Sequence, residues 1–234
     1  DLRSILNKIT LKNRDSLLPK IMEIVHLIMN DECEYDEEGE SNDEQDSYVR
    51  IIQLLLDIVK KMNGGHEIYV IVLKEMIQCY PSIITQMNES ITTYKKSYDR
   101  IVDIDANQDY DGYCELVKHN DYRRSTSKFI VHLTEYNLLH ADELAAMIEQ
   151  LFETVMLNID IESKTVLIEE VTENLFLFMI HSYPFLKSHQ KWETLIEKLN
   201  ECSKLKARDH KSISSRIVFK YMDIQDALKK CNNV

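Results

Sequence analysis

The sequence predicts an all-α fold, an α-solenoid of about five antiparallel helical hairpins of the HEAT type. Glycine and proline are scarce, at four and three of 234 residues, while 44% of residues are hydrophobic. This composition disfavours folds built from short strands and turns. Apolar residues recur at helical spacing in successive segments. Each pair of segments takes about 40 residues, the period of HEAT repeats. We therefore expect residues 1–234 to form a single helical-repeat domain, with a globular α-helical bundle as the alternative.

The N-terminal part of the chain predicts three helices, after a short segment over residues 2–10 that is apolar on one side and basic on the other. Pro19 is tolerated only in a first turn, so the first helix is expected to begin near Asp15 or Ser16. The second ends at Gly64 and Gly65, because glycine commonly terminates helices. The third runs up to Pro81. These expected helices cover residues 15–28, 51–62 and 68–80.

The rest of the chain continues the pattern with six helices, which makes about nine in all. A more polar helix begins at Ile83, and a loop follows over 103–112. A central helical hairpin then spans 125–156, with Ser125 or Thr126 as the N-cap of its first helix. Its two helices are separated by a break at 137–141. The last three helices are expected over 166–183, which Pro184 stops, and over 192–202 and 213–228.

An acidic stretch dominates the net charge of −12. Residues 31–46 hold ten carboxylates and no Lys or Arg, and the rest of the chain carries only −2. Such a composition cannot bury apolar surface, so we expect a disordered, solvated loop over 31–46. The near-neutral remainder gives no strong general attraction for nucleic acid.

The sequence offers no template for catalysis, and we expect no enzyme, no cofactor and no metal site. The four glycines cannot form a phosphate-binding loop, and the eight histidines never fall in a metal-binding spacing. Residues 103–111 alternate like a calcium loop. However, its sixth position is Gln108 instead of glycine, and its twelfth is Cys114 instead of glutamate.

The cellular compartment is predicted from two features that the sequence lacks. No run of eighteen apolar residues could form a membrane span. The five cysteines are scattered without paired spacing, which favours reduced thiols. We therefore expect a cytoplasmic protein that has no membrane partner.

Some aromatic and basic residues have two interpretations. Trp192 could anchor a partner, but apolar neighbours at 195 and 196 favour core packing. Tyr94 and Tyr98 could stack on bases, although helix packing is favoured. A basic set in one interhelix loop could contact phosphate as weak RNA-binding residues, or could simply be solvated. It consists of Lys204, Lys206, Arg208, His210 and Lys211.

Three short motifs resemble those of one family and occur in the same order, and their positions span most of the chain. Residues Ser4 to Thr10 read S-I-L-N-K-I-T and resemble the S-I-L-N-K-L-T that opens the middle domain of eukaryotic translation initiation factor 4G. Residues 123–124 (R-R) and 128–133 (K-F-I-V-H-L) resemble its arginine-rich loop followed by K-F-I-G-E-L. Residues 214–219, S-S-R-I-V-F, resemble its S-S-R-I-R-F.

The resemblance implies a translation-initiation scaffold with helicase-binding and weaker RNA-binding residues. In that family the two ends of a helical crescent bind a DEAD-box RNA helicase of the initiation factor 4A type. Binding favours the half-closed helicase and stimulates it. Flanking segments of the family bind the cap-binding protein, and RNA is a further expected partner. The helicase contacts are expected at Leu6, Ile9, Thr10, Arg14, Lys128, Phe129, Ser215, Arg216 and Phe219. The weak RNA contacts are expected at Arg123, Arg124, Lys204, Lys206, Arg208 and Lys211.

The chain departs from the family pattern at several motif positions. Leu11 replaces the family's proline, and Arg14 and Thr134 stand where it has aromatic residues. Val131-His132 replaces its Gly-Glu. These changes predict a divergent member with its own cognate helicase. Two alternatives stay open: a related scaffold in nuclear cap binding, splicing or nonsense-mediated decay, and a direct RNA-binding module.

Overall fold

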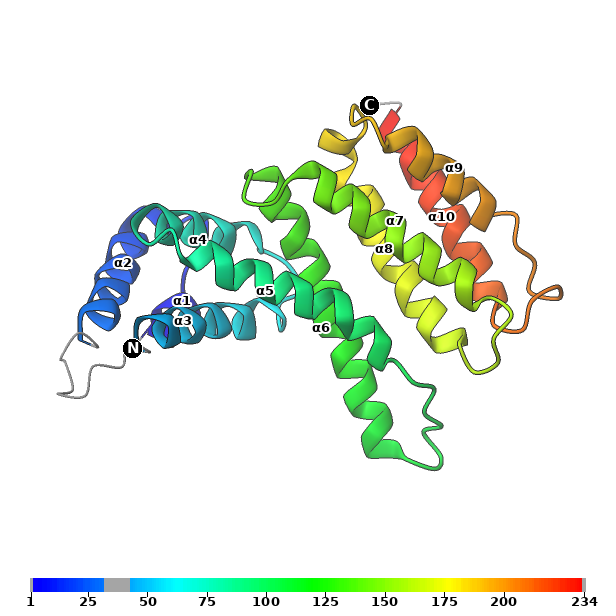
Figure 1. Cartoon of the computed structure of the whole chain (residues 1–234), viewed down its shortest axis with the longest axis horizontal. Coiled ribbons are helices and arrows are strands. Elements are labelled where there is room, and N and C mark those ends of the chain that lie inside the picture. Colours follow the sequence, from blue (N-terminus) through cyan, green and yellow to red (C-terminus); the bar gives the residue numbers. More distant parts are fainter. Residues whose placement is uncertain (1, 32–42, 233–234) are drawn as a thin grey trace. The chain divides into compact units, whose positions relative to one another are not determined.

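The computed structural model describes the backbone of residues 2–31 and 43–232, and all regular structure in these residues is helical (Figure 1). The all-α prediction is therefore confirmed. The contacts divide the chain into two compact units, Asp1–Thr93 and Tyr94–Val234, which are described separately. The helices are α1 (Leu2–Leu6), α2 (Arg14–Asp31), α3 (Asp43–Val59), α4 (Glu67–Cys79), α5 (Ile83–Lys96), the 3₁₀ turn η1 (Ser97–Arg100), α6 (Tyr110–Glu135), α7 (Ala141–Asn158), α8 (Thr165–Leu186), α9 (Trp192–Cys202) and α10 (Ser215–Asn232).

In the first unit, α2 packs against α1, α3 and α4. The apolar stripes expected from the sequence face one another, and Ile21, Leu55 and Leu73 are fully buried between these helices. A buried hydrogen bond joins the short α1 to α4. In this bond the Tyr69 hydroxyl donates to the carbonyl of Leu6 over 2.9 Å.

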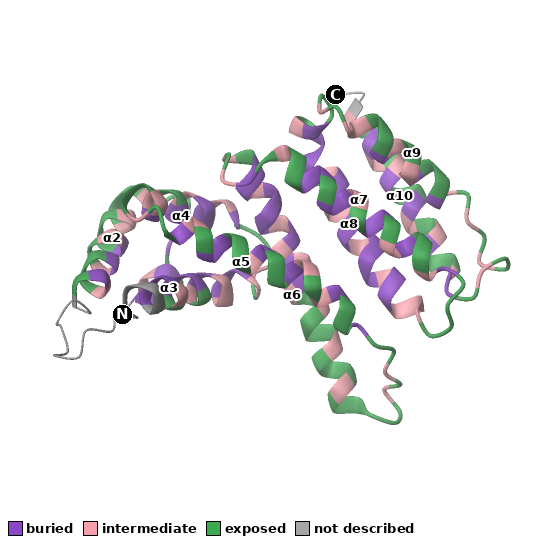
Figure 2. Ribbon diagram, viewed as in Figure 1, coloured by how far each residue is buried: buried purple, intermediate pink, exposed green. Residues whose placement is uncertain are grey.

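In the second unit, α8 is the central helix and packs against α6, α7 and α10. It is apolar on most of its circumference, which is typical of a helix surrounded by others. Leu175, Phe178 and Met179 of α8 are fully buried, and buried residues occur along the whole length of this helix (Figure 2). Helix α9 packs against α7 and α10. The hairpin order expected for α7 to α10 is therefore present, with each helix close to its predicted bounds.

The central hairpin begins earlier than expected, because Ser125 and Thr126 do not cap a helix. Helix α6 runs without interruption from Tyr110 through both residues. The Thr126 hydroxyl donates to the carbonyl of Tyr122, and the Ser127 hydroxyl donates to that of Arg123. Hydroxyl groups can bond to the preceding turn in this way inside a helix. The true N-cap is Asp109, whose carboxylate accepts from the Gly112 amide at 2.8 Å.

Both helix boundaries predicted from proline lie within three residues of the observed ones, but each proline stands inside its helix. Helix α2 begins at Arg14, so Pro19 lies beyond its first turn, and α8 continues two residues past Pro184 to Leu186. Each proline removes one backbone hydrogen bond from its helix. Burial of neighbouring apolar residues, such as Ile21 and Tyr183, offsets that loss.

The predicted acidic loop falls mostly outside the described residues, which omit 32–42. Its last four residues begin α3, since that helix starts at Asp43. No helix of the described ranges is long and apolar enough to cross a membrane.

Candidate functional site

The first turns of α10 divide the third sequence motif between core and surface. Ser214 sets the start of the helix, because its hydroxyl accepts from the Ile217 amide at 3.3 Å and donates to Glu169 at 3.0 Å. Ile217 and Tyr221 are then fully buried. Four other positions in this part of the helix are exposed: Ser215, Arg216, Phe219 and Met222.

We call Arg216, Phe219 and Met222 the α10 face. They are three residues apart in turn, so they follow one another along one side of the helix. Phe219 is 63% exposed and Met222 is 44% exposed. Burying an aromatic side chain stabilises a fold by roughly a few kcal/mol. The exposed Phe219 ring contributes little of this stabilisation in the isolated chain. Aromatic, Met and Arg side chains are also the types enriched at protein–protein interfaces.

Arg216 is held in place by acidic residues of α8. Its guanidinium lies 3.6 Å from a carboxylate oxygen of Glu169 and 3.6 Å from one of Glu173. Lys220, one turn along, contacts Glu173 at 2.8 Å and lies over the Phe176 ring. The Arg216 side chain is still 68% exposed, so these ion pairs orient it without covering it.

The N-terminal motif is divided in a similar way. Leu6 and Ile9 are core residues, at 0% and 4% exposure, so a helicase cannot contact them as we predicted. Thr10 is exposed, and Arg14 is partly exposed and paired with Asp15 at 3.0 Å. The loop between α1 and α2 is fixed by Asn13. Its side chain accepts from the Thr10 amide and donates to the Lys8 carbonyl.

The middle motif contributes mainly to the core. Phe129 is completely buried in the second unit, so it was wrongly assigned to the helicase contact. Lys128, its neighbour, is partly exposed. Leu133, at the end of the same motif, is also completely buried.

Arg123 and Arg124 were predicted to contact RNA weakly, but both belong to a buried polar network. Arg124 donates to Glu170 of α8 over 2.6 Å. Arg123 is 7% exposed and donates to the Ser97 carbonyl and to the Asn120 side chain. The Arg123 guanidinium is therefore not free to neutralise a phosphate, and we withdraw it from the RNA contacts. The Arg124 side chain is paired with Glu170 but is still 35% exposed, so it stays a candidate for weak RNA contact.

Glu170 is the central carboxylate of this network, at 1% exposure. Besides Arg124, it accepts from the Asn174 side-chain amide at 2.7 Å. Burial raises the pKa of Glu170, because the low-dielectric interior disfavours its charged form, while Arg124 and Asn174 act in the opposite direction. Burial also lowers the pKa of the Arg123 guanidinium.

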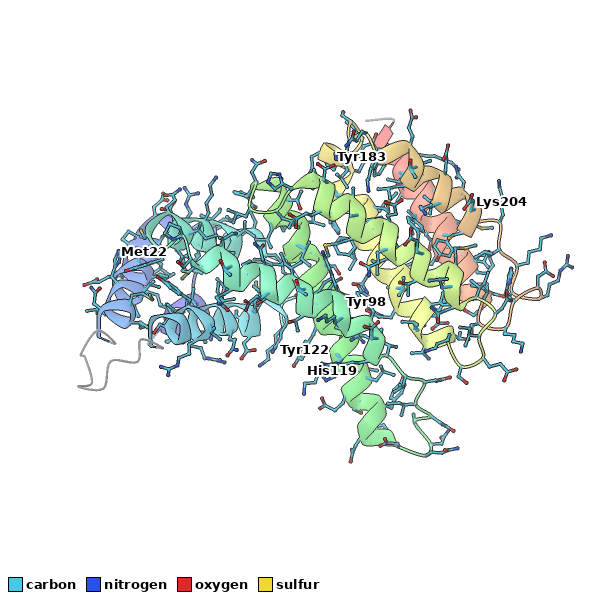
Figure 3. The ribbon with its side chains drawn as sticks, in the orientation of Figure 1. Met22, Tyr98, His119, Tyr122, Tyr183 and Lys204 are labelled. Carbon is cyan, nitrogen blue, oxygen red and sulfur yellow. The ribbon has the colours of Figure 1, made fainter. Side chains whose placement is uncertain are left out.

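Hydroxyl groups continue the network to Tyr98 of η1, which is labelled in Figure 3. Ser127 donates to Asn174 over 2.5 Å and lies 2.7 Å from the Tyr94 hydroxyl, which in turn lies 2.6 Å from that of Tyr98. Burial raises the pKa of both tyrosines, so they stay neutral. Both are buried, and the helix-packing interpretation of Tyr94 and Tyr98 is confirmed.

The basic loop after α9 is exposed, as a phosphate contact would require. Lys204, labelled in Figure 3, is exposed together with Lys206 and Arg208. Lys211 is also exposed and pairs with Glu162 at 3.0 Å. Ser212 anchors the end of this loop, because its amide donates to Ile159 over 2.9 Å. These four residues stay candidates for weak RNA contact.

Candidates for chemistry are few in the described part of the chain. It contains no group of three or more metal-ligating side chains. Two aspartates of the calcium-like loop have local roles: Asp105 accepts from the Asn107 amide, and Asp109 caps α6. Burial raises the pKa of the Cys202 thiol to about 12, so that thiol remains protonated and unreactive.

No protein-family model matches the chain, and no curated protein matches it. The candidate site is thus defined by the residues of this chain alone. Its best-supported part is the α10 face, where a sequence motif coincides with exposed apolar side chains. Thr10 and Arg14 of the first unit form a second, smaller candidate surface.

Sequence reasoning missed the buried network around Glu170. A signal was present, since Glu170 and Asn174 are polar residues four apart in a helix that is otherwise strongly apolar. Such a pair lies on one side of the helix, and polar groups in a buried helix require hydrogen-bond partners. The sequence could not identify those partners, because Arg124 and Ser127 come from a segment more than forty residues away.

Proposed function

We propose that this chain is a HEAT-type scaffold domain, similar to the middle domain of translation initiation factor 4G, that binds a DEAD-box RNA helicase of the initiation factor 4A type. In this role it catalyses nothing itself and acts in the cytoplasm. The observation that carries the proposal is the α10 face. The motif S-S-R-I-V-F places Arg216 and Phe219 at the surface, while its Ile217 is in the core.

Packing alone does not account for these exposed residues. A solvent-facing position of a helix normally carries a polar side chain, yet Phe219 and Met222 are both exposed there. An exposed aromatic ring beside a fixed cation can anchor a protein partner, because burying it on binding recovers its transfer free energy. The acidic residues Glu169 and Glu173 hold Arg216 in position beforehand, which reduces the entropy lost on binding.

The mechanism we propose is a shift of the helicase population. A scaffold favours one helicase conformation only as far as it binds that conformation better than the open one. The α10 face and the surface around Thr10 and Arg14 lie in different units of the chain. Each would bind a different lobe of the helicase, as the family resemblance implies.

The α10 face can be tested with Phe219→Ala. We expect the helicase Kd to rise by about thirtyfold, which corresponds to the roughly 2 kcal/mol of an interface hot spot. The melting temperature should change little, because the ring is already mostly solvent-exposed. The measurement is calorimetric titration with the purified helicase, together with a thermal melt.

Leu157→Ala is the matched control, since Leu157 of α7 is 75% exposed and lies outside the motif. It should leave both the Kd and the melting temperature unchanged. If Phe219→Ala binds the helicase as tightly as the wild type, the α10 face is not the interface.

A further inference from the structure

A second exposed apolar surface lies between α9 and α10, in the second unit. We call it the α9–α10 groove, a space of about 550 Å³. It is formed by the first turns of α9 and the last turns of α10, which lie beside each other because the helices are antiparallel (Figure 1). Tyr183, labelled in Figure 3, contributes from the C-terminal end of α8. Phe219 does not line it, so the groove is separate from the α10 face.

The floor of the groove is apolar and aromatic. Leu199 and Leu228 are buried at its base, and Trp192 and Ile196 are only partly covered. The Trp192 and Tyr183 rings are in edge-to-face contact, with centroids 5.7 Å apart. The core-packing interpretation of Trp192 is therefore only partly confirmed, because one side of the indole borders the groove. A volume of this size accommodates two or three bulky side chains.

One end of the groove is closed by hydrogen bonds. The Gln225 side-chain amide donates to Asn200 over 2.7 Å and to Ser203 over 3.1 Å, which joins α10 to α9. These bonds fix the spacing of the two helices at that point. The groove is therefore a pre-formed feature of the hairpin.

The rim of the groove carries negative charge that the chain does not neutralise. Glu193 and Glu197 are exposed on α9, and no ion pair holds either of them within the described residues. On the opposite rim Lys229 is paired with Asp226 at 3.1 Å. Glu149 of α7, by contrast, is paired with Lys191 at 3.0 Å. An apolar floor with two unpaired carboxylates complements a ligand that is apolar and basic.

The spacing of the two glutamates favours a helical ligand. Residues four apart on a helix have Cβ atoms about 6 Å apart, and basic residues at the same spacing on a second helix can face them. A groove between two helices also suits the apolar side of a third. We propose that the α9–α10 groove binds an amphipathic helix of a partner protein, with bulky apolar side chains flanked by Lys or Arg.

The test uses the intact chain and a pair of designed peptides. Both form one amphipathic helix with leucine on one side; one carries arginines at positions four apart beside the leucines, the other glutamates. Trp192 is the only tryptophan, so its emission reports directly on the groove. We expect the arginine peptide to shift this emission and the glutamate peptide to bind at least tenfold more weakly.

A second test reverses the charge of the two groove glutamates. It remains decisive even if the affinity for the peptides is modest. The variant Glu193→Lys/Glu197→Lys should lose about tenfold in affinity for the arginine peptide and should now prefer the glutamate peptide. Binding is measured by the anisotropy of labelled peptide. The matched control, Glu143→Lys/Asp223→Lys, changes two exposed carboxylates outside the groove and should behave as the wild type.

Three results would overturn the proposal. The first is equal binding of both peptides, and the second is no change in Trp192 emission at saturating arginine peptide. The third is self-association of the chain that the Glu193→Lys/Glu197→Lys variant abolishes, which would assign the groove to a second copy. Helicase binding is tested separately with the Phe219→Ala variant. The groove proposal and the proposed helicase binding can therefore fail independently of each other.

Discussion

Replacing Arg124 with leucine is expected to lower the free energy of unfolding of the second unit by about 3–5 kcal/mol. Arg124 is the main cation facing the Glu170 carboxylate, which is 1% exposed. Its removal leaves a buried charge whose only remaining hydrogen bond among those described comes from the Asn174 amide, with Arg123 as a weaker nearby cation. An uncompensated buried carboxylate is costly, because the protein interior solvates charge poorly.

The loss of unfolding free energy in Arg124→Leu should depend on pH. Burial raises the pKa of Glu170 in the folded state, while Arg124 opposes that rise. A carboxyl group whose folded pKa lies above its unfolded value binds more protons when folded, so stability falls as pH rises through that interval. Without Arg124 the folded pKa rises further. The deficit of Arg124→Leu should therefore be largest at neutral pH and should shrink as the medium is acidified and Glu170 becomes protonated.

Urea denaturation of the variant and wild type at neutral and mildly acidic pH measures this effect. The double variant Arg124→Leu/Glu170→Gln should recover most of the loss, because the neutral amide can still bond to Asn174. Arg100→Leu, at an exposed arginine, should change stability by less than about 0.5 kcal/mol. A deficit that is equal at both pH values, or that the double variant does not reduce, would contradict a charged Glu170 balanced by Arg124.

The second large effect is expected at Phe129. Phe129→Ala should destabilise the second unit by about 3–5 kcal/mol, because it removes a completely buried ring and leaves a cavity. Any loss of helicase binding would then follow from partial unfolding. Chemical denaturation and a binding titration at low temperature, where the variant is still folded, separate the two causes.

Lys128→Ala is the control for Phe129, since it changes the adjacent, partly exposed residue of the same motif. We expect it to cost less than about 1 kcal/mol. A Phe129→Ala protein of normal stability that fails to bind the helicase would return Phe129 to the interface and contradict its place in the core.

Helix periodicity predicted most of the fold. The stripes that give α4, α7 and α9 are bounded by strong local signals, such as Pro81 after α4 and the break before Ala141. Local signals failed where tertiary packing outweighed them. Ser125 reads as an N-cap, yet α6 continues through it because Phe129 and Ile130 are buried on one side of a longer helix.

The candidate site was harder to predict than the fold. A motif gives residues in order, but exposure depends on which side of a helix faces the core. Arg216 and Ile217 are adjacent in one motif, and only the first is at the surface. For the same reason Phe129 was mistaken for a contact residue and Arg123 for an RNA-binding one. The α9–α10 groove was not foreseen, because it is formed by residues on three different helices.

The central claim is that this chain binds a DEAD-box helicase in preference to RNA. The most direct measurement is a parallel titration of the chain with a purified helicase of the initiation factor 4A type and with single-stranded RNA, at low and at physiological ionic strength. We expect helicase binding at both, because apolar contacts such as Phe219 are not screened by salt. RNA contacts through Lys204, Lys206, Arg208 and Lys211 should weaken steeply with salt, to roughly micromolar Kd or poorer. Tight, salt-resistant RNA binding without detectable helicase binding would contradict the scaffold function.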